Sequence, residues 1–565
     1  MDFKMITADS AIPIETHFKV IAGPGAGKTR FLINHIQHIL HKSERLGRNK
    51  KMACITYTNI GVETILKRLS NEHDHVEVCT IHSFLFLHVV RPFIPLISRK
   101  HKIDIDKLKG PSDHLISGFF KKTSALERQY KLSNVDVVKH LFWSIDNDNE
   151  CKLHIKGRKV DMHNSLYRYK QMFWEKGILH YDDVLAFAWE IMHDYPDVLR
   201  VIRSKFPYIF IDEFQDTSPL QTRIIKKIAE KETIVGVIGD AAQSIYGFKG
   251  SDVKQFEKFN LENISFYKME YNHRSTEQII NLLNTIRSDI IQRSPENKQG
   301  NLPTILIGHP LKAVKYIHNL LNTEDLYTLS FSNIKANSLR DKIDYDDFIT
   351  FETLESVFTE NDSTSDRRKI MISFIKAIEY ARLLNFKKAI QEISRSTIGI
   401  SDKRRALEII QQMLAEYPTY KDEPIQKLYE KIVSLNIDIP VIAIRKKPTK
   451  IEVFYKSKKY SELALLIQNQ ENHGFDRTIH QAKGSEFENV LVNVLPNKQK
   501  YSEERELGFL LNPDVSNKED HRVYYVAVSR AKSNLFFCVP SLSPSAAKKL
   551  SELCVIFTLA PFKKE

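Results

Sequence analysis

A glycine-rich segment near the N-terminus constrains the fold of this chain more than any other feature. It runs from Ala22 to Thr29, reads Ala-Gly-Pro-Gly-Ala-Gly-Lys-Thr, and directly follows the apolar run Phe18 to Ile21. The residues after it place their apolar side chains at the spacing of one helix face. A strand, a glycine loop and a helix in this order predict a phosphate-binding loop, in which backbone N–H groups and the helix N-terminus surround the phosphates.

The loop predicts a binding site for a nucleoside triphosphate. Lys28 is expected to reach the β- and γ-phosphates, and the Thr29 hydroxyl to bind Mg²⁺. Ala22 stands at the first position, where the general pattern has glycine. The residues expected to bind the nucleotide here are Ala22, Gly23, Pro24, Gly25, Ala26, Gly27, Lys28, Thr29 and Arg30.

A pair of acids follows a second apolar run, Tyr208 to Ile211. In this position Asp212 can hold Mg²⁺ through water, and Glu213 can orient or deprotonate the attacking water. Two solvated acids would be the commoner interpretation of such a pair alone. The phosphate loop in the same chain favours the catalytic interpretation.

Composition sets the broad class of protein. The chain of 565 residues is too long to form a single compact core, so several domains are expected. Its contents of 42% apolar and 27% charged residues are ordinary for a globular protein. Lys and Arg outnumber Asp and Glu by 83 to 70, a formal charge of +13. This excess favours a polyanionic partner, although basic and acidic residues alternate along most of the chain.

Cysteine spacing and hydropathy exclude further classes. The five cysteines are never spaced as C-x-x-C, which argues against a disulfide framework or a zinc site. We expect no signal peptide and no membrane span, because no apolar run reaches about 20 residues. The sequence therefore predicts a cytoplasmic protein without a membrane partner.

Apolar β-rich runs cluster before about residue 275 and after about residue 450, as in strands buried on both faces of a parallel sheet. Two helical, charged stretches interrupt these clusters, and the first, after Arg91, shows no comparable strand series. We therefore expect an α/β fold with two parallel-sheet halves, each carrying a mainly helical insertion.

Further motifs follow the phosphate loop in a fixed order. They are Thr56–Asn59, Thr80–Ser83, Asp212–Asp216, Gly239–Gly250, Asn272–Ser275, Thr478–Phe487 and Tyr524–Ala531. Asp212–Asp216 reads Asp-Glu-Phe-Gln-Asp, which is far more specific than an Asp-Glu pair. With these motifs the chain resembles the UvrD/Rep/PcrA-like branch of superfamily 1 DNA helicases.

The resemblance implies two RecA-like P-loop domains, each a parallel sheet flanked by helices and carrying a mainly helical insertion. The implied boundaries are residues 1–90 and 196–268 for domain 1A, 91–195 for insertion 1B, 269–342 and 450–565 for domain 2A, and 343–449 for a reduced insertion 2B.

The resemblance also implies the remaining nucleotide contacts. Gln243 would sense the γ-phosphate, and Arg274 and Arg530 would reach it from the second domain. Gly484 and Glu486 would contact the ribose. The implied catalytic set is Lys28, Asp212, Glu213, Gln243, Arg274 and Arg530, with Thr29 and Asp212 holding Mg²⁺.

Single-stranded DNA is the implied polymer. Phe248 would stack on a base, a contact that tolerates any sequence, whereas packing in a core is the alternative for Phe248 and Tyr246. The implied DNA contacts are Thr56, Tyr57, Thr58, Asn59, His82, Tyr246, Phe248, Lys249, Thr478 and His480.

Two departures from the family pattern affect the prediction. No glutamine occurs from Ile12 to Lys19, where the family reads adenine, and His273 replaces the tyrosine that stacks on it. ATP is the nucleotide that the family implies. Because these two adenine contacts are missing, we expect the enzyme to accept other nucleoside triphosphates as well. Tyr181-Asp182-Asp183 resembles a family element, but we interpret it as the cap of a helix.

The leading hypothesis is an ATP-dependent, 3′-to-5′ translocase or helicase acting on single-stranded or 3′-tailed DNA. Both insertions look reduced, so translocation is the safer prediction than processive unwinding. The alternative is a regulatory subunit that senses DNA or nucleotide and activates an OLD-like nuclease partner, as in Gabija-type antiviral defence. A third hypothesis is an ATPase that does not use DNA.

Overall fold

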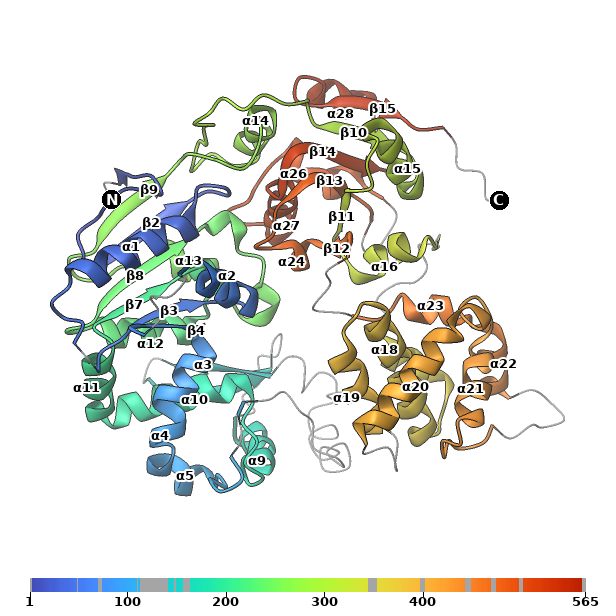
Figure 1. Cartoon of the computed structure of the whole chain (residues 1–565), viewed down its shortest axis with the longest axis horizontal. Helices are drawn as coiled ribbons and strands as arrows, with labels where there is room; N and C mark the ends of the chain where they lie inside the picture. Colours follow the sequence, from blue (N-terminus) through green and yellow to red (C-terminus); the bar gives the residue numbers. More distant parts are fainter. Residues whose placement is uncertain are drawn as a thin grey trace. The chain divides into compact units, whose positions relative to one another are not determined.

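A computed structural model describes most of the chain. The described residues are 3–47, 49–69, 74–108, 110–111, 141–146, 149–155, 163–343, 353–396, 402–442, 449–468, 474–496 and 501–560. They form two compact units (Figure 1). Unit 1 comprises Met1–Arg274, Arg287–Glu296 and Ser516–Arg522, and unit 2 comprises Ser275–Ile286, Asn297–Val515 and Val523–Glu565.

Unit 1 is built on a seven-stranded sheet in which every pairing is parallel. The strand order is β1-β9-β2-β8-β7-β3-β4. The strands are β1 (Lys4–Met5), β2 (Phe18–Ala22), β3 (Met52–Thr56), β4 (Val76–Thr80), β7 (Tyr208–Ile211), β8 (Ile234–Gly239) and β9 (Ser265–Met269). The apolar runs Phe18 to Ile21 and Tyr208 to Ile211, predicted as strands, are confirmed as β2 and β7.

Alternate residues of these strands enter two different hydrophobic cores. On β3, Met52 and Cys54 pack on one face, and Ala53 and Ile55 pack on the other. Both faces are covered because helices flank the sheet on each side, as a parallel sheet requires. Each large apolar side chain buried in this way contributes about 1.5–3 kcal/mol.

Two groups of helices cover these faces. One face packs against α1 (Lys28–Lys42) and α2 (Asn59–Leu69). The other packs against α3 (Ile81–Leu85), α10 (Tyr181–Asp194), α11 (Pro196–Lys205), α12 (Pro219–Ala229) and α13 (Val253–Glu257). Helices α4 (Arg91–Phe93), α5 (Pro95–His101) and α9 (His163–Trp174) complete the unit, with a π-helical turn at Phe86–Val90.

The first insertion differs from its prediction in one respect. It contains an antiparallel hairpin of β5 (Leu141–Ile145) and β6 (Cys151–Ile155). The insertion was predicted to be mainly helical with no comparable strand series, and this hairpin was not predicted, because its strands are only five residues long and Ser144, Lys152 and His154 interrupt their apolar residues. The capping interpretation of Asp183 is confirmed, because its carboxylate accepts the His180 backbone N–H at 3.0 Å and closes a capping box on α10.

Asp183 is fully buried and holds the first insertion together. It lies 2.9 Å from the ammonium of Lys170 and accepts hydrogen bonds from the indoles of Trp143 and Trp174 at 3.0 and 2.9 Å. Burial opposes ionisation, but the Lys170 ammonium and the His180 ring hold the pKa of the Asp183 carboxyl well below its usual range.

Unit 2 contains a six-stranded, all-parallel sheet of order β12-β11-β13-β14-β10-β15. The strands are β10 (Thr304–Ile307), β11 (Tyr327–Ser330), β12 (Asp476–Thr478), β13 (Phe487–Asn493), β14 (Ala531–Val539) and β15 (Val555–Thr558). Its helices are α14 (Glu277–Ile286), α15 (Pro310–Leu321), α16 (Asn333–Asp341), α24 (Ile479–Ala482), α25 (Glu503–Glu506), α26 (Gly508–Leu511), α27 (Glu519–Val528) and α28 (Pro544–Leu550). The first residues of α27, up to Arg522, belong to unit 1.

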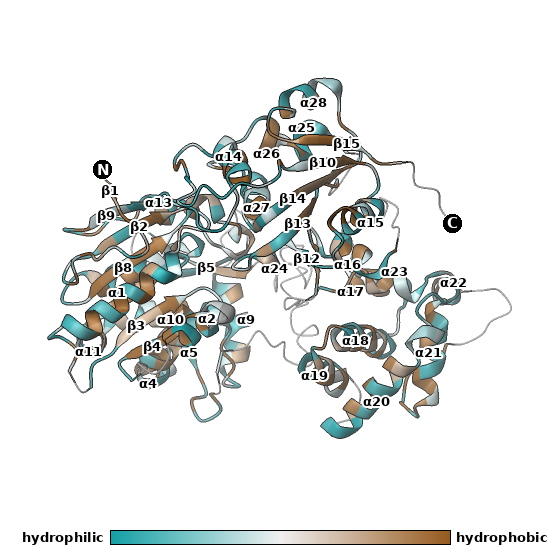
Figure 2. Cartoon of the chain, turned by 45° about the horizontal axis from the view of Figure 1, so that its top comes forward, coloured by the Kyte–Doolittle hydropathy of each residue, from teal (hydrophilic) through white to brown (hydrophobic). Residues whose placement is uncertain are grey.

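The second insertion is helical throughout its described part. Its helices are α17 (Leu354–Asn361), α18 (Ser365–Arg382), α19 (Phe386–Ser396), α20 (Lys403–Ala415), α21 (Ile425–Ser434), α22 (Lys450–Ser457) and α23 (Tyr460–Ala464), and they enclose one apolar core. Figure 2 shows these helices as two-sided, with hydrophobic residues on one side and hydrophilic residues on the other. Two ion pairs join α18 to α16, Arg340 with Glu379 and Arg382 with Asp341.

The α/β class, with parallel sheets flanked by helices, is therefore confirmed. The domain boundaries stay a prediction, and the division by contacts falls after Arg274 rather than after residue 268. Within the described residues no single helix is long and apolar enough to cross a membrane; one pair bent by 82°, Ile81–Phe93 with Pro95–His101, passes by length and composition only.

Candidate functional site

The predicted motifs of unit 1 gather at one edge of its sheet. Strands β9, β2, β8, β7 and β3 are neighbours, and each is followed at its carboxyl end by a motif. The carboxyl ends of parallel strands lie at the same edge, which is where α/β sheets bind ligands. Residues far apart in sequence are thus brought to one edge of the sheet.

The phosphate loop has the geometry that its sequence predicts. Gly25 and Gly27 have φ angles of 70° and 82°, a left-handed conformation that side chains other than glycine rarely adopt. The helix α1 begins at Lys28, whose Nζ lies 3.4 Å from the carbonyl oxygens of Ala22 and Gly23. The ammonium therefore lies over the loop, where a bound phosphate would meet it.

The two acids end β7 as expected. Asp212 is 6% exposed, and its Oδ1 accepts the Glu213 backbone N–H at 2.9 Å. Glu213 itself has a φ of 55°, a strained conformation for a residue with a side chain. Such strain costs about 1 kcal/mol and is found most often at functional sites.

Buried hydrogen bonds join these acids to the predicted γ-phosphate sensor. The Gln215 amide donates to the Glu213 carboxylate and accepts the Asp240 backbone N–H at 3.0 Å. Asp240 Oδ2 accepts the side-chain amide of Gln243 at 2.6 Å, and Asp240 Oδ1 lies 2.7 Å from the Arg287 guanidinium. The sequence predicts no role for Gln215, Asp240 or Arg287, although the first two lie inside motifs.

Two aromatic side chains follow the sensor. Tyr246 is 8% exposed and stacks on Tyr57 with ring centroids 5.0 Å apart. Burial raises the pKa of the Tyr57 hydroxyl, so this group is neutral. Phe248 is 56% exposed, with its ring centroid 6.1 Å from that of Tyr246. The Tyr246 side chain is therefore packed in the interior, whereas the Phe248 ring has an accessible face.

The other predicted DNA residues of unit 1 differ in exposure, because Thr56 is buried whereas Thr58 is exposed. Thr56 is 3% exposed, and the Thr58 hydroxyl accepts the Gly61 backbone N–H at 3.1 Å. Burial lowers the pKa of His82 to about 4, so its imidazole is neutral near pH 7. The side chains of Asn59 and Lys249 lie outside the described part of the structure.

Arg30 and Asn34, in the first half of α1, form a polar cluster with Asp9. Arg30 donates to both carboxylate oxygens of Asp9, at 2.8 and 2.9 Å, and Asn34 donates to the same carboxylate at 3.0 Å. His273 is exposed, and its ring centroid lies 6.4 Å from that of Tyr271.

The predicted residues of unit 2 lie at two opposite edges of its sheet. Arg530 and Glu486 immediately precede β14 and β13, at the amino edge, whereas Thr478 ends β12 at the carboxyl edge. Arg530 is 2% exposed and donates to the Ser485 carbonyl at 3.1 Å. Glu486 lies 3.0 Å from the Lys532 ammonium.

At the carboxyl edge, the Thr478 hydroxyl accepts the Gln481 backbone N–H and caps α24, and the His480 ring meets Phe331 edge-on. At the other edge, Gly484 is exposed with a φ of 86°.

The backbone beside Arg274 also reaches β14, because the Ser275 hydroxyl donates to the Ala531 carbonyl at 2.7 Å. The sequence placed Arg274 within the second domain; the structure places it in unit 1, at the crossing between the units.

The donor set suits Mg²⁺ bound together with phosphates. A hydroxyl, Thr29, and one carboxylate, Asp212, are what this ion takes beside phosphate oxygens and water. The described residues include no group of three or more His, Cys, Asp and Glu placed to hold a metal ion by themselves. All five cysteines are free.

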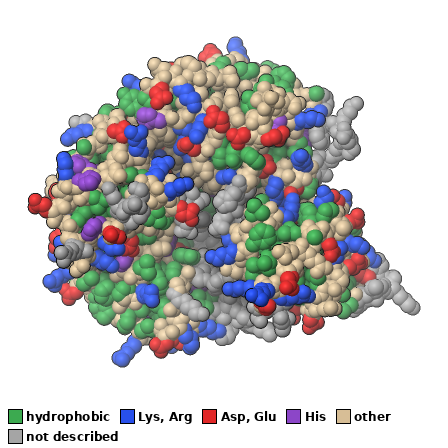
Figure 3. Space-filling model, in the orientation of Figure 1, with side chains coloured by type: hydrophobic (Ala, Val, Ile, Leu, Met, Phe, Trp, Pro, Cys, Tyr) green, Lys and Arg blue, Asp and Glu red, His purple; other side chains and the backbone are tan. Residues whose placement is uncertain are grey.

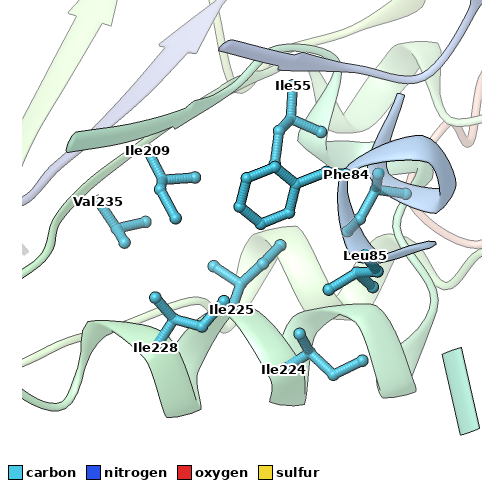
Figure 4. Close-up of a pocket in the computed structure, with 9 residues that line it drawn as sticks. Ile55, Phe84, Leu85, Ile209, Ile224, Ile225, Ile228 and Val235 are labelled. Atoms are coloured by element: carbon cyan, nitrogen blue, oxygen red, sulfur yellow. The ribbon is translucent and has the colours of Figure 1, made fainter. Parts of the chain in front are cut away.

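An apolar pocket lies beneath this edge of the sheet and is not the site. Figure 4 shows the Phe84 ring pointing between strands β3 and β7 and the helix α12. Its lining consists of Ile55, Ile81, Phe84, Leu85, Ile209, Ile224, Ile225, Ile228 and Val235. Without a polar group to orient a phosphate, this space belongs to the core.

A parallel sheet with a phosphate loop, paired acids and a γ-phosphate sensor at its carboxyl edge defines a P-loop nucleotide hydrolase. Two family models match the chain, the UvrD/REP helicase N-terminal domain over residues 6–263 and the UvrD-like helicase C-terminal domain over residues 364–541. The chain belongs to the UvrD-like helicase family.

Curated relatives agree with this assignment. The chain is 24% identical to the ATP-dependent DNA helicase PcrA of Bacillus subtilis, over 92% of this chain and 80% of PcrA. It is 27% identical to PcrA of Staphylococcus aureus, over 49% of this chain and 38% of that protein. It is also 28% identical to the Gabija protein GajB of Bacillus cereus, over 48% of this chain and 47% of GajB. The matched part thus spans less than half the length of two of these relatives.

Proposed function

We propose that this protein is an ATP-dependent translocase or helicase that moves 3′-to-5′ on single-stranded DNA. Mg²⁺-bound nucleotide hydrolysis between two RecA-like domains would drive the movement. The polarity comes from the resemblance to relatives named as DNA helicases, and Mg²⁺ from the donor set of Thr29 and Asp212.

One observation carries the proposal. A chain of hydrogen bonds runs from Glu213 through Gln215 and Asp240 to Gln243, and the exposed ring of Phe248 follows five residues later. A change at the γ-phosphate can therefore be transmitted to a stacking platform for bases. An ATPase that does not use DNA would have no need of this connection.

In the proposed mechanism Lys28 binds the phosphates and Glu213 orients the attacking water. Mg²⁺, when bound through Thr29 and Asp212, would neutralise charge on the β- and γ-phosphates. Arg274 and Arg530 would stabilise the transferring phosphoryl group. The guanidinium of Arg530 is buried against Ser485 and Ser529, so the proposal requires it to turn toward the nucleotide.

Nucleotide selectivity depends on the residues that would meet the base. The base side of the loop presents Asp9, Arg30 and His273 instead of the glutamine and tyrosine of the family. We infer that the enzyme accepts triphosphates other than ATP.

A regulatory subunit is the second candidate function, favoured by the similarity to the Gabija protein GajB. In this role the same ATP and DNA sites would report DNA ends or nucleotide depletion to an OLD-like nuclease partner in antiviral defence.

Strand displacement distinguishes the two candidates. The wild-type chain alone, with ATP and a 3′-tailed duplex, is expected to release the shorter strand, and Lys28→Ala is expected to release none. DNA-stimulated hydrolysis without any displacement by the wild type would favour the regulatory subunit. Displacement of a 5′-tailed duplex instead would contradict the proposed polarity.

A further inference from the structure

A short segment of unit 1, Arg287 to Glu296, carries no motif and has no role in the family pattern described above. We call it the strap. The chain before and after the strap belongs to unit 2. The strap runs beside residues 270–272, since the Asn272 N–H donates to the Arg293 carbonyl at 2.9 Å and the Arg293 N–H to the Glu270 carbonyl at 3.0 Å. It therefore lies along the segment that leads directly to Arg274.

One end of the strap contacts Asp240, which is hydrogen-bonded to the predicted γ-phosphate sensor. The fully buried guanidinium of Arg287 donates to Asp289 at 2.8 and 2.6 Å and to Asp240 at 2.7 Å, and Asp240 in turn accepts from Gln243. Burial opposes ionisation of Asp289, but Arg287 holds the pKa of this carboxyl below its usual range. Because an unpaired buried charge is costly, these ion pairs fix the strap to the sensor loop.

Further along, Gln292 contacts the phosphate loop. It is 2% exposed, its Nε2 donates to the Pro24 carbonyl at 2.7 Å, and its Oε1 accepts from Asn272 Nδ2 at 3.3 Å. A Cβ built at Gly23 would lie 2.4 Å from Gln292 Nε2. The glutamine amide thus packs directly on the loop backbone.

Asn272 continues this connection to Arg274. Its Oδ1 accepts the Arg274 backbone N–H at 2.9 Å, and the neighbouring His273 N–H donates to the Gly25 carbonyl at 3.0 Å. Two consecutive carbonyls of the loop, at Pro24 and Gly25, are therefore bound by the groups that set the position of Arg274.

We propose that Gln292 is a positioning residue for nucleotide hydrolysis, which keeps the phosphate loop in register with Arg274. It touches no phosphate and acts through Pro24 and Asn272. An amide suits this role because it donates to one partner and accepts from the other, which neither an apolar nor a carboxylate side chain can do. The inference rests on the proposed function as a nucleotide hydrolase.

The test replaces the amide without removing its volume. Gln292→Met is expected to lower the DNA-stimulated kcat about tenfold while changing the affinity for a fluorescent ADP less than about threefold. Gln411→Met, at an exposed position of α20, is the matched control and should leave both values unchanged. Gln292→Glu keeps the shape but loses the donor to Pro24, and it should reproduce the loss if Gln292→Met folds poorly.

Coupling to Arg274 separates positioning from general support of the fold. In single-turnover assays Gln292→Met should cost less than about twofold in an Arg274→Ala background, because the group to be positioned is already absent. An equal tenfold loss in both backgrounds, or a kcat within twofold of wild type, would overturn the proposal for Gln292. A wild-type protein that hydrolyses no nucleotide would instead overturn the proposed function.

Discussion

Phe248 offers a direct test of the DNA-binding surface. Its ring is 56% exposed, whereas the neighbouring Tyr246 is only 8% exposed. Stacking of one base on such a ring contributes about 1–3 kcal/mol. With a central value of about 2 kcal/mol, Phe248→Ala should raise the Kd for single-stranded DNA about thirtyfold.

Fluorescence anisotropy with a labelled oligothymidine, at one fixed salt concentration, measures this change. Stability should change by no more than about 0.5 kcal/mol, because the side chain is largely exposed. The matched control is Phe557→Ala on β15, where the ring is 43% exposed and no DNA contact is predicted. A Kd for Phe248→Ala within twofold of wild type would refute the stacking role.

Three further outcomes are expected. Asp183→Asn should lower the free energy of unfolding in urea by about 3 kcal/mol at pH 7, because the buried Lys170 ammonium loses its partner, whereas the exposed Asp182→Asn should cost less than about 0.5 kcal/mol. Since the pKa of Asp183 is lowered in the folded state, this difference should shrink as the pH falls below about 4. Arg530→Ala should lower kcat about 10³-fold in a phosphate-release assay, and an unchanged kcat would exclude its contact with the γ-phosphate. Values of kcat/KM for ATP and GTP should be comparable, and a preference for ATP of about a hundredfold, or nearly 3 kcal/mol, would contradict the inferred tolerance.

The sequence predicted the strands that lie in the middle of a parallel sheet. Runs such as Tyr208–Ile211 are apolar at every position because both faces are buried. The short strands β11 and β12 escaped prediction, since four and three residues that include polar side chains produce no recognisable period. The hairpin in the first insertion escaped for the same reason.

The chemical centre of the site was likewise predictable, because its residues occupy fixed positions in motifs at strand ends. The residues that support this centre from other segments of the chain could not be predicted. Gln292 and Pro24 are separated by 268 residues, and neither spacing nor composition indicates that they touch. The ion pair of Arg287 with Asp240 depends in the same way on how the strap returns to unit 1. Contacts of this kind follow from tertiary packing alone.

Charge gave less information than the motifs. On the face shown in Figure 3, Lys and Arg side chains are interspersed with Asp and Glu, as the alternation along the sequence suggested. DNA binding is therefore inferred from the exposed ring of Phe248 and from the family, and not from the net charge of +13.

The most direct test of the account is phosphate release from ATP by the purified chain, with and without single-stranded DNA. DNA is expected to accelerate hydrolysis by the wild type, and Lys28→Ala is expected to abolish hydrolysis in both conditions. Hydrolysis that DNA does not change, or that persists in Lys28→Ala, would contradict it.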